Sequence, residues 1–145
     1  MKSLVPALGV ADIATSVQFY SEVLGFEVMF TFPGDDGELV HASVRRGDSE
    51  FMFGRLRGDQ HDQAPLGRGV SFYMTVGDNE DIDDFFTRVK ASGAEVIQEP
   101  TDQFWGNRDW AVADPDGYHL YVAKAVRQVS PEQMRDAMLS GSPAD

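Results

Sequence analysis

Val10-Ala11-Asp12, a helical segment and Gly25-Phe26-Glu27-Val28 form a pattern that recurs later as Val76-Gly77-Asp78, a second helical segment and Gly93-Ala94-Glu95-Val96. The offset is 66 residues at the first landmark and 68 at the second. Each copy places a strand before an Asp-capped amphipathic helix, and a glycine and another strand after it. This repetition within 145 residues predicts two related modules in one pseudo-symmetric domain.

The first copy predicts a strand, a helix and three more strands. Residues 4–10 are a short apolar run, and Asp12 is placed to cap the helix that follows. Apolar residues then recur at helical spacing until Gly25, which is suited to a left-handed helix stop. The three further strands are predicted at residues 26–32, 39–44 and 51–53.

The second copy predicts the same order of elements. A strand at residues 70–76 precedes a helix that Asp78 would cap and that Gly93 would end. We interpret the acidic residues of its first turn as a solvated helix start, since negative charge is favourable there. The remaining elements are predicted as a strand at 95–98, a loop at 100–107, a strand at 109–113, a tight turn at 114–117 and a strand at 118–125.

Four segments of the chain together resemble the vicinal oxygen chelate superfamily, which includes glyoxalase I, extradiol dioxygenases and bleomycin-resistance proteins. They span residues 4–125 and are Val10–Phe26, His41–Ser49, Phe104–Arg108 and Asp114–Tyr118. The resemblance implies an α+β fold in which two βαβββ modules form a curled mixed sheet around a cavity. We expect a single domain at 1–128, with module one at 1–55, a linker at 56–68 and module two at 69–128.

Residues 129–145 lie outside the repeat and predict a short C-terminal helix with a tail. Ser130 and Gln133 fit a capping box, and Pro131 occupies the first helical position. The helix has one narrow apolar stripe that must pack on its own sheet or on a second subunit. Members of the superfamily commonly pair so that two chains build each cavity, so the resemblance implies a homodimer.

The composition argues against several classes of protein. With 24 acidic and 12 basic residues, the net charge of −12 disfavours contact with nucleic acid or anionic lipid. The absence of cysteine excludes disulfides, thiolate nucleophiles and zinc-thiolate sites. The sequence shows neither a signal peptide nor an apolar run long enough to span a bilayer, so we expect a cytoplasmic protein.

The superfamily's metalloenzymes hold a metal through one side chain from each of four strands. By the family's pattern these positions fall here on Val5, Met52, Ser71 and Tyr121. Such side chains cannot assemble a site for a divalent cation, which needs imidazole or carboxylate ligands. The resemblance therefore predicts a protein without metal or another cofactor, and argues against glyoxalase or dioxygenase chemistry.

No other catalytic constellation is evident. His41, His61 and His119 are too far apart in sequence for a compact metal site, and no serine lies in a nucleophile motif. We therefore predict no catalytic residues.

Aromatic side chains offer a different kind of site. Strand alternation places Ser71 and Tyr73 on one face, and the family register would turn that face, with Tyr121, toward the cavity. Aromatic surfaces of this kind bind planar or cationic organic molecules. The predicted ligand-binding residues are His41, Met52, Ser71, Tyr73, Phe104, Trp105, Arg108, His119 and Tyr121.

The favoured function is a metal-free binding protein of the bleomycin-resistance type, which sequesters an aromatic or cationic small molecule at a dimer interface. One alternative is a glyoxalase-like enzyme that uses an unrecognised metal set or acid–base chemistry centred on His41 or His119. A further alternative is an interaction module whose cavity is filled by side chains. Bound metal would distinguish the first two, and a pocket large enough for a ligand would distinguish both from the third.

Overall fold

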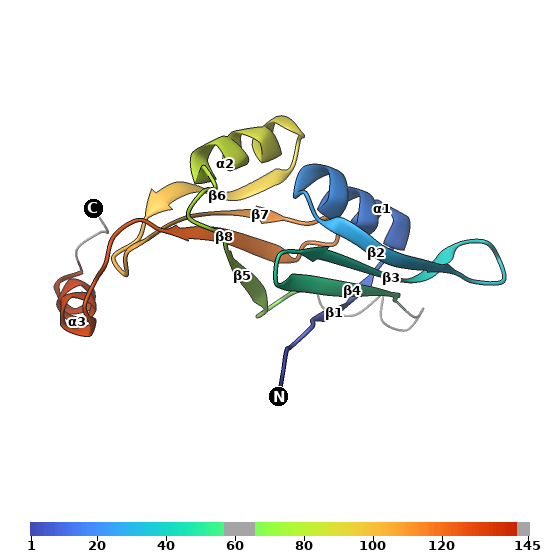
Figure 1. Ribbon diagram of the computed structural model, residues 1–145, viewed down its shortest axis with the longest axis horizontal. Coiled ribbons are helices and arrows are strands. Elements are labelled where there is room, and N and C mark those ends of the chain that lie inside the picture. The colour runs from blue at the N-terminus through green and yellow to red at the C-terminus, as the bar shows by residue number, and fades with distance from the viewer. Residues whose placement is uncertain (57–65, 142–145) are drawn as a thin grey trace. The chain divides into compact units, whose positions relative to one another are not determined.

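The computed structural model describes residues 1–56 and 66–141 and confirms an α+β fold with two βαβββ modules (Figure 1). Residues 57–65 of the predicted linker, with His61, and residues 142–145 of the tail lie outside the described residues. The modules form two separate four-stranded sheets, and their common curl around a cavity stays a prediction. The chain divides into two compact units, residues 1–68 with 114–118 and residues 69–113 with 119–145.

The first module builds sheet A, in which the strand order is β1-β4-β3-β2. Strand β1 is parallel to β4, and the other neighbours are antiparallel. Helix α1 continues into one π-helical turn, η1, and α1 contacts β3 and β4 from one face of the sheet. The elements are β1 (Ala7–Val10), α1 (Ile13–Gln18), η1 (Phe19–Val23), β2 (Glu27–Pro33), β3 (Leu39–Arg46) and β4 (Ser49–Arg55).

The second module repeats this topology as sheet B, with the order β5-β8-β7-β6. Helix α2 packs on one face through Ile82, Phe85, Phe86 and Val89, which are all buried. Helix α3 follows β8 and has no buried residue. The elements are β5 (Ser71–Thr75), α2 (Ile82–Ala91), β6 (Glu95–Asp102), β7 (Asn107–Ala113), β8 (His119–Ala125) and α3 (Pro131–Ser140). No helix among the described residues is long and apolar enough to cross a membrane.

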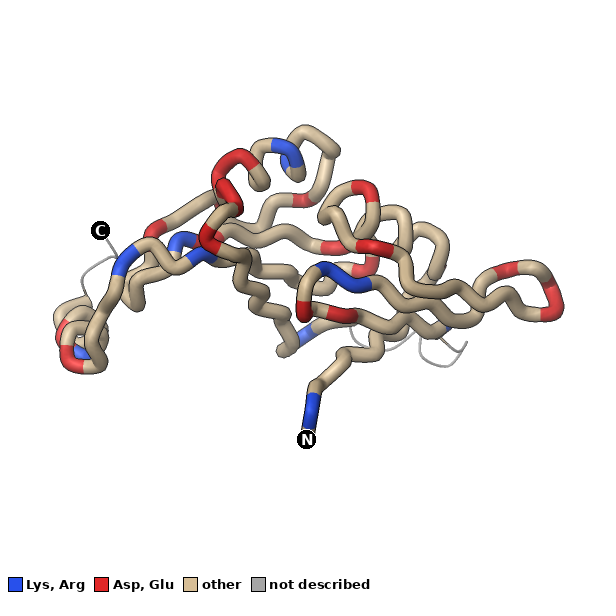
Figure 2. The backbone as a smooth tube through the Cα atoms, viewed as in Figure 1, with Lys and Arg blue, Asp and Glu red and all other residues tan. Residues whose placement is uncertain are grey.

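The helix caps agree with the sequence except at α2. Asp12 caps α1 by accepting a hydrogen bond from the Thr15 amide, and the capping box of α3 is present. The predicted cap of α2, Asp78, is wrong, because Asp81 accepts from the Asp84 amide at 2.9 Å and the helix begins at Ile82. The first buried residue of the helix is also Ile82, so packing selects the later of the two aspartates. Acidic residues gather at this end of α2 (Figure 2), where the helix dipole favours them.

The predicted loop at residues 100–107 is also partly wrong, since β6 continues to Asp102. Proline has no backbone N–H to donate to a neighbouring strand, so Pro100 favours the end of a strand in the sequence pattern. The strand lies at the edge of sheet B, and its register with β7 is irregular on either side of Gln98. An edge strand with such irregularities accommodates proline without losing a paired amide.

The turn at 114–118 belongs to the first unit, and its side chains bond to residues between Gly9 and Tyr20. Asp114 is buried and accepts a hydrogen bond from the Tyr20 hydroxyl at 3.0 Å. Asp116 accepts from the Ala11 amide at 2.8 Å, and the Tyr118 hydroxyl donates to the Gly9 carbonyl at 3.0 Å. The predicted tight turn is therefore also an attachment point for the first module.

Burial raises the pKa of Asp114, and this gives a pH-dependent prediction. A carboxyl whose folded pKa is raised binds a proton more readily in the folded state, so its contribution to stability grows as pH falls. We expect wild type to gain stability relative to Asp114→Asn as pH falls from neutral toward the ordinary aspartate value of 3.8. Urea unfolding of both proteins at several pH values measures this, and a difference that stays constant or shrinks would contradict it.

Candidate ligand-binding site

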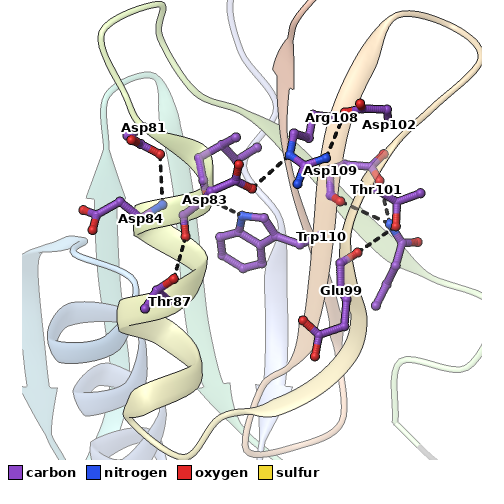
Figure 3. Close-up of polar contacts among 12 residues, drawn as sticks. Asp81, Asp83, Asp84, Thr87, Glu99, Thr101, Asp102, Arg108, Asp109 and Trp110 are labelled. Atoms are coloured by element: carbon purple, nitrogen blue, oxygen red, sulfur yellow. Dashed lines mark hydrogen bonds and ion pairs between the residues drawn. The ribbon is translucent and has the colours of Figure 1, made fainter. Parts of the chain in front are cut away.

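The candidate site lies on the face of sheet B opposite α2, which we call the helix-free face of sheet B. Trp110 on β7 points toward α2 (Figure 3). Its ring packs against Phe85 and Phe86 of that helix. Because side chains alternate along a strand, the neighbours of Trp110 point to the other face. The helix-free face of sheet B comprises Ser71, Tyr73, Thr75, Gln98, Asn107, Asp109, Ala111, His119 and Tyr121.

Two tyrosines form the aromatic part of this face. Tyr73 and Tyr121 are register partners on the parallel strands β5 and β8, and their rings stack with centroids 6.2 Å apart and planes at 26°. Tyr73 is 46% exposed, and Tyr121 is half-buried. The pair thus offers an accessible flat surface to a planar molecule.

A buried carboxylate lies beneath this aromatic surface. Asp109 is only 1% exposed, and its Oδ2 accepts a hydrogen bond from the Tyr73 hydroxyl at 3.0 Å. Its Oδ1 accepts from the side-chain amides of Gln98 at 2.6 Å and Gln103 at 2.8 Å. All three partners donate, so Asp109 acts here as an acceptor-only carboxylate.

The Tyr73 hydroxyl is held from several sides. Besides donating to Asp109, it accepts hydrogen bonds from Asn107 Nδ2 at 3.0 Å and Trp105 Nε1 at 3.3 Å. Burial raises the pKa of Tyr73, which keeps the hydroxyl protonated and able to donate. The network therefore fixes the orientation of the half-exposed ring.

The loop between β6 and β7 brings Phe104 and Trp105 to this network. Their rings meet edge to face with centroids 4.9 Å apart. Gly106 has a φ of +99°, and a Cβ there would overlap the Arg127 carbonyl oxygen. The Gly106 carbonyl accepts from the amides of Val126 and Arg127, so the loop is pinned against the segment that follows β8. Only glycine suits both the backbone angle and the close approach.

The remaining predicted site residues of the second unit occupy different places. Ser71 and His119 are register partners at the exposed end of the helix-free face of sheet B. Arg108 points to the other side, where it forms ion pairs with Asp83 of α2 at 2.9 Å and Asp102 at 3.0 Å (Figure 3). We leave Arg108 out of the proposed site because both ion pairs hold it on the side of α2.

His41 and Met52 belong to the first unit and lie on the face of sheet A opposite α1. The ring centroid of His41 is 5.5 Å from that of Phe30, which in turn lies 5.1 Å from Phe32. Gly54 pairs with His41, and a Cβ built on Gly54 meets no atom within 4 Å. Sheet A therefore carries a second, separate aromatic surface with open space beside it.

The side chains at the four positions predicted to correspond to metal ligands do not fit a metal centre. Ser71 and Tyr121 lie on the helix-free face of sheet B, Met52 lies on sheet A, and Val5 lines a polar groove with Arg45 and other residues of the first unit. None of them supplies an imidazole or carboxylate. Within residues 1–56 and 66–141, no group of three or more His, Asp or Glu side chains is arranged to hold a metal ion.

Sequence reasoning identified the tyrosines and Trp105 but missed Asp109, Gln98 and Gln103. A usable signal was the alternation along β7, which places Asp109 and Ala111 on the same face of the sheet. Ala111 pairs with Tyr121, so Asp109 lies on the face that carries Tyr121. Nothing in the sequence indicated Gln98 or Gln103, because their contacts depend on how β6 and its loop lie beside β7.

Comparisons with known proteins place these features in a family context. A model of the Glyoxalase/Bleomycin resistance protein/Dioxygenase superfamily matches residues 4–122. An uncharacterised protein from Mycobacterium bovis is 32% identical, over 95% of this chain and 93% of that protein. A bleomycin resistance protein from Geobacillus stearothermophilus is 31% identical, over 80% of this chain and 91% of that protein.

Solved structures show the same fold. TioX from Micromonospora sp. ML1 is 25% identical, with a TM-score of 0.68 over 87% of this chain and all of that one. TnmS3, an antibiotic binding protein from Streptomyces sp. CB03234, is 22% identical, with a TM-score of 0.65 over 86% of this chain and 98% of that one. The second likeness concerns the fold alone.

Proposed function

Because the chain belongs to the Glyoxalase/Bleomycin resistance protein/Dioxygenase superfamily, we propose that it is a metal-free small-molecule-binding protein that sequesters an aromatic or cationic ligand. The observation that carries the proposal is the stacked pair Tyr73 and Tyr121, in which a hydrogen-bond network holds the Tyr73 hydroxyl. The similarity to a bleomycin resistance protein supports a small-molecule ligand.

The chemistry of the site supports binding rather than a metal-dependent reaction. The four positions that hold the metal in the superfamily's metalloenzymes carry Val5, Met52, Ser71 and Tyr121, which are unsuitable donors. A planar ligand stacked on the tyrosines would bury apolar surface on both partners and gain ring–ring attraction.

We also propose that the protein is a homodimer and that a second copy completes the ligand cavity. Several apolar side chains are exposed in each unit, including Phe32 on β2 and Met138 and Leu139 on α3, which are 56%, 68% and 80% exposed. Apolar exposure of this extent is typical of surfaces that a partner covers.

Titration with metal-free bleomycin and with a panel of planar aromatic antibiotics tests the binding proposal. We expect at least one saturable interaction with wild type, unchanged by excess EDTA. Tyr121→Ala should weaken it about thirtyfold or more, because truncation of a hot-spot aromatic contact costs about 2 kcal/mol or more. Isothermal titration calorimetry gives the dissociation constants of wild type and of Tyr121→Ala.

Phe19→Ala is the matched control, since Phe19 is a half-buried aromatic residue of η1 in the other unit. It should leave the dissociation constant unchanged. Loss of binding in the EDTA-treated protein, with recovery on adding one metal equivalent, would instead favour the glyoxalase-like alternative. The absence of any saturable ligand would count against a binding function.

A further inference from the structure

We infer that the helix-free face of sheet B prefers planar organic cations to uncharged molecules of the same shape, and that Asp109 determines this preference. The inference rests on the proposed function, because it concerns a ligand stacked on Tyr73 and Tyr121. It adds the charge of the ligand and the residue that selects it.

The first step is the charge of Asp109. Its side chain is almost fully buried, and its three partners, Tyr73, Gln98 and Gln103, are uncharged donors. Within the described part of the chain, no lysine or arginine forms an ion pair with it. The adjacent Arg108 is directed to the other face by Asp83 and Asp102.

A buried carboxylate without a counter-ion keeps a strong local field, because little water is present to screen it. The hydrogen bonds from neutral groups reduce the cost of burial but leave the net charge in place. The helix-free face of sheet B therefore includes a buried negative charge, in contact with the Tyr73 hydroxyl, that no ion pair neutralises among the described residues.

Tyr73 connects Asp109 to the accessible part of this face. Its hydroxyl donates to Asp109 Oδ2 at 3.0 Å, and the amide of Asn107 and the indole of Trp105 hold the same oxygen from other directions. Hydrogen bonds in a network polarise one another, so a phenol that donates to a carboxylate has a more negative ring face. Tyr73 is 46% exposed, so a ligand can reach that ring.

A cation on this surface gains from two sources. The ring faces of Tyr73 and Tyr121 attract it through their quadrupoles, and the carboxylate beneath adds a direct electrostatic attraction. An uncharged planar molecule gains only the stacking and the burial of apolar surface. The difference predicts a preference of about tenfold or more for the cation.

A purely structural role for Asp109 would have a different consequence. If the carboxylate served only to hold Tyr73 and the 103–106 loop in place, removing its charge would weaken the binding of planar cations and of uncharged molecules equally. The ratio of two dissociation constants separates these roles, while either constant alone does not.

The test uses N-methylquinolinium and 4-methylquinoline, which share their size and shape and differ in charge at mildly alkaline pH. Isothermal titration calorimetry measures both with wild type, Asp109→Asn and Glu99→Gln. We expect wild type to bind the cation about tenfold more tightly or better. Asp109→Asn should lose most of that preference, so that the ratio of its two dissociation constants approaches one, since the substitution preserves size and removes the charge.

Glu99→Gln is the matched control, because it removes one negative charge from an exposed position on β6, where Glu99 pairs with Lys90 at 2.8 Å. It should retain the preference of wild type. The comparison of the two probes on the wild-type protein does not depend on any variant, so the inference stays testable even if Asp109→Asn fails to fold.

Four results would overturn the inference. Equal affinity of wild type for both probes would do so while leaving the proposed binding function intact. A preference retained by Asp109→Asn, or lost equally in Glu99→Gln, would show that overall charge rather than Asp109 determines selectivity. Failure of wild type to bind either probe would count against the proposed function at this face and against the inference together.

Discussion

Tyr20→Ala is expected to lower the free energy of unfolding by about 4–5 kcal/mol, which is near the upper end for a buried aromatic residue. The Tyr20 ring is fully buried and packs against Phe26, Phe51 and Phe53, with centroids 5.0 to 5.7 Å away. The substitution leaves a cavity in the core of the first unit. It also removes the hydroxyl that donates to Asp114, a buried carboxyl whose remaining partners are backbone amides.

Tyr20→Phe separates the two contributions, because it keeps the ring and removes only the hydroxyl. We expect it to cost about 1–3 kcal/mol, which is the usual range when a buried acceptor loses its donor. Urea unfolding followed by circular dichroism measures both variants. Equal losses for Tyr20→Ala and Tyr20→Phe would show that the ring contributes little, contrary to the packing described above.

Trp110→Ala is expected to cost about 3–5 kcal/mol for the same reason in the second unit. Trp110 is fully buried between β7 and α2, with Phe85 at 5.2 Å and Phe86 at 5.6 Å between ring centroids. Its indole nitrogen donates to the Ile82 carbonyl at 3.1 Å, which ties the first turn of α2 to the sheet. Losing both the packing and this bond should lower the melting temperature by roughly 10 °C or more.

The protein's other tryptophan supplies the comparison, since the chain has only two. Trp105 is half-buried in the loop after β6, and its indole donates to Tyr73 rather than to the core. Trp105→Ala should cost about 1 kcal/mol or less, as is usual for a substitution outside the core. Differential scanning calorimetry of the two variants tests the ranking, and a larger loss for Trp105→Ala would reverse our assignment of core and site.

Both stability predictions concern residues buried between a helical segment and its sheet, whereas the ligand predictions concern the helix-free face of sheet B. Alternation along β7 makes this separation sharp, because Trp110 faces α2 while its neighbours Asp109 and Ala111 do not. Substitutions on the helix-free face of sheet B can therefore test binding without removing the hydrophobic core.

Local sequence signals succeeded where the decisive interaction lies within a few residues. The caps at Asp12 and Ser130 and the left-handed glycine at Gly25 all depend on neighbours in the chain, and the structure has each of them. The cap of α2 failed because two aspartates were both suitable. Only the packing of Ile82 on the sheet selects Asp81.

Long-range contacts explain what sequence reasoning could not reach. Asp114 bonds to Tyr20, 94 positions earlier, and Asp109 meets Tyr73, 36 positions earlier. Pro100 is tolerated in β6 because that strand is an edge, which is a fact about pairing rather than about the local sequence. Arg108 lies three positions after Trp105 in the sequence. Its ion pair with Asp83 of α2 nevertheless directs it to the face of sheet B that carries the helix.

The sequence by itself determined that this protein has two βαβββ modules, because periodicity, caps and glycine stops are encoded by neighbouring residues and occur twice. The prediction that the superfamily's metal-ligand positions carry no suitable donors rests on the family resemblance and stays a prediction. Only the tertiary structure decided which side chains meet on the helix-free face of sheet B. The carboxylate beneath Tyr73 arises from strand pairing between β5, β8 and β7, and such pairing brings together residues that the chain keeps far apart.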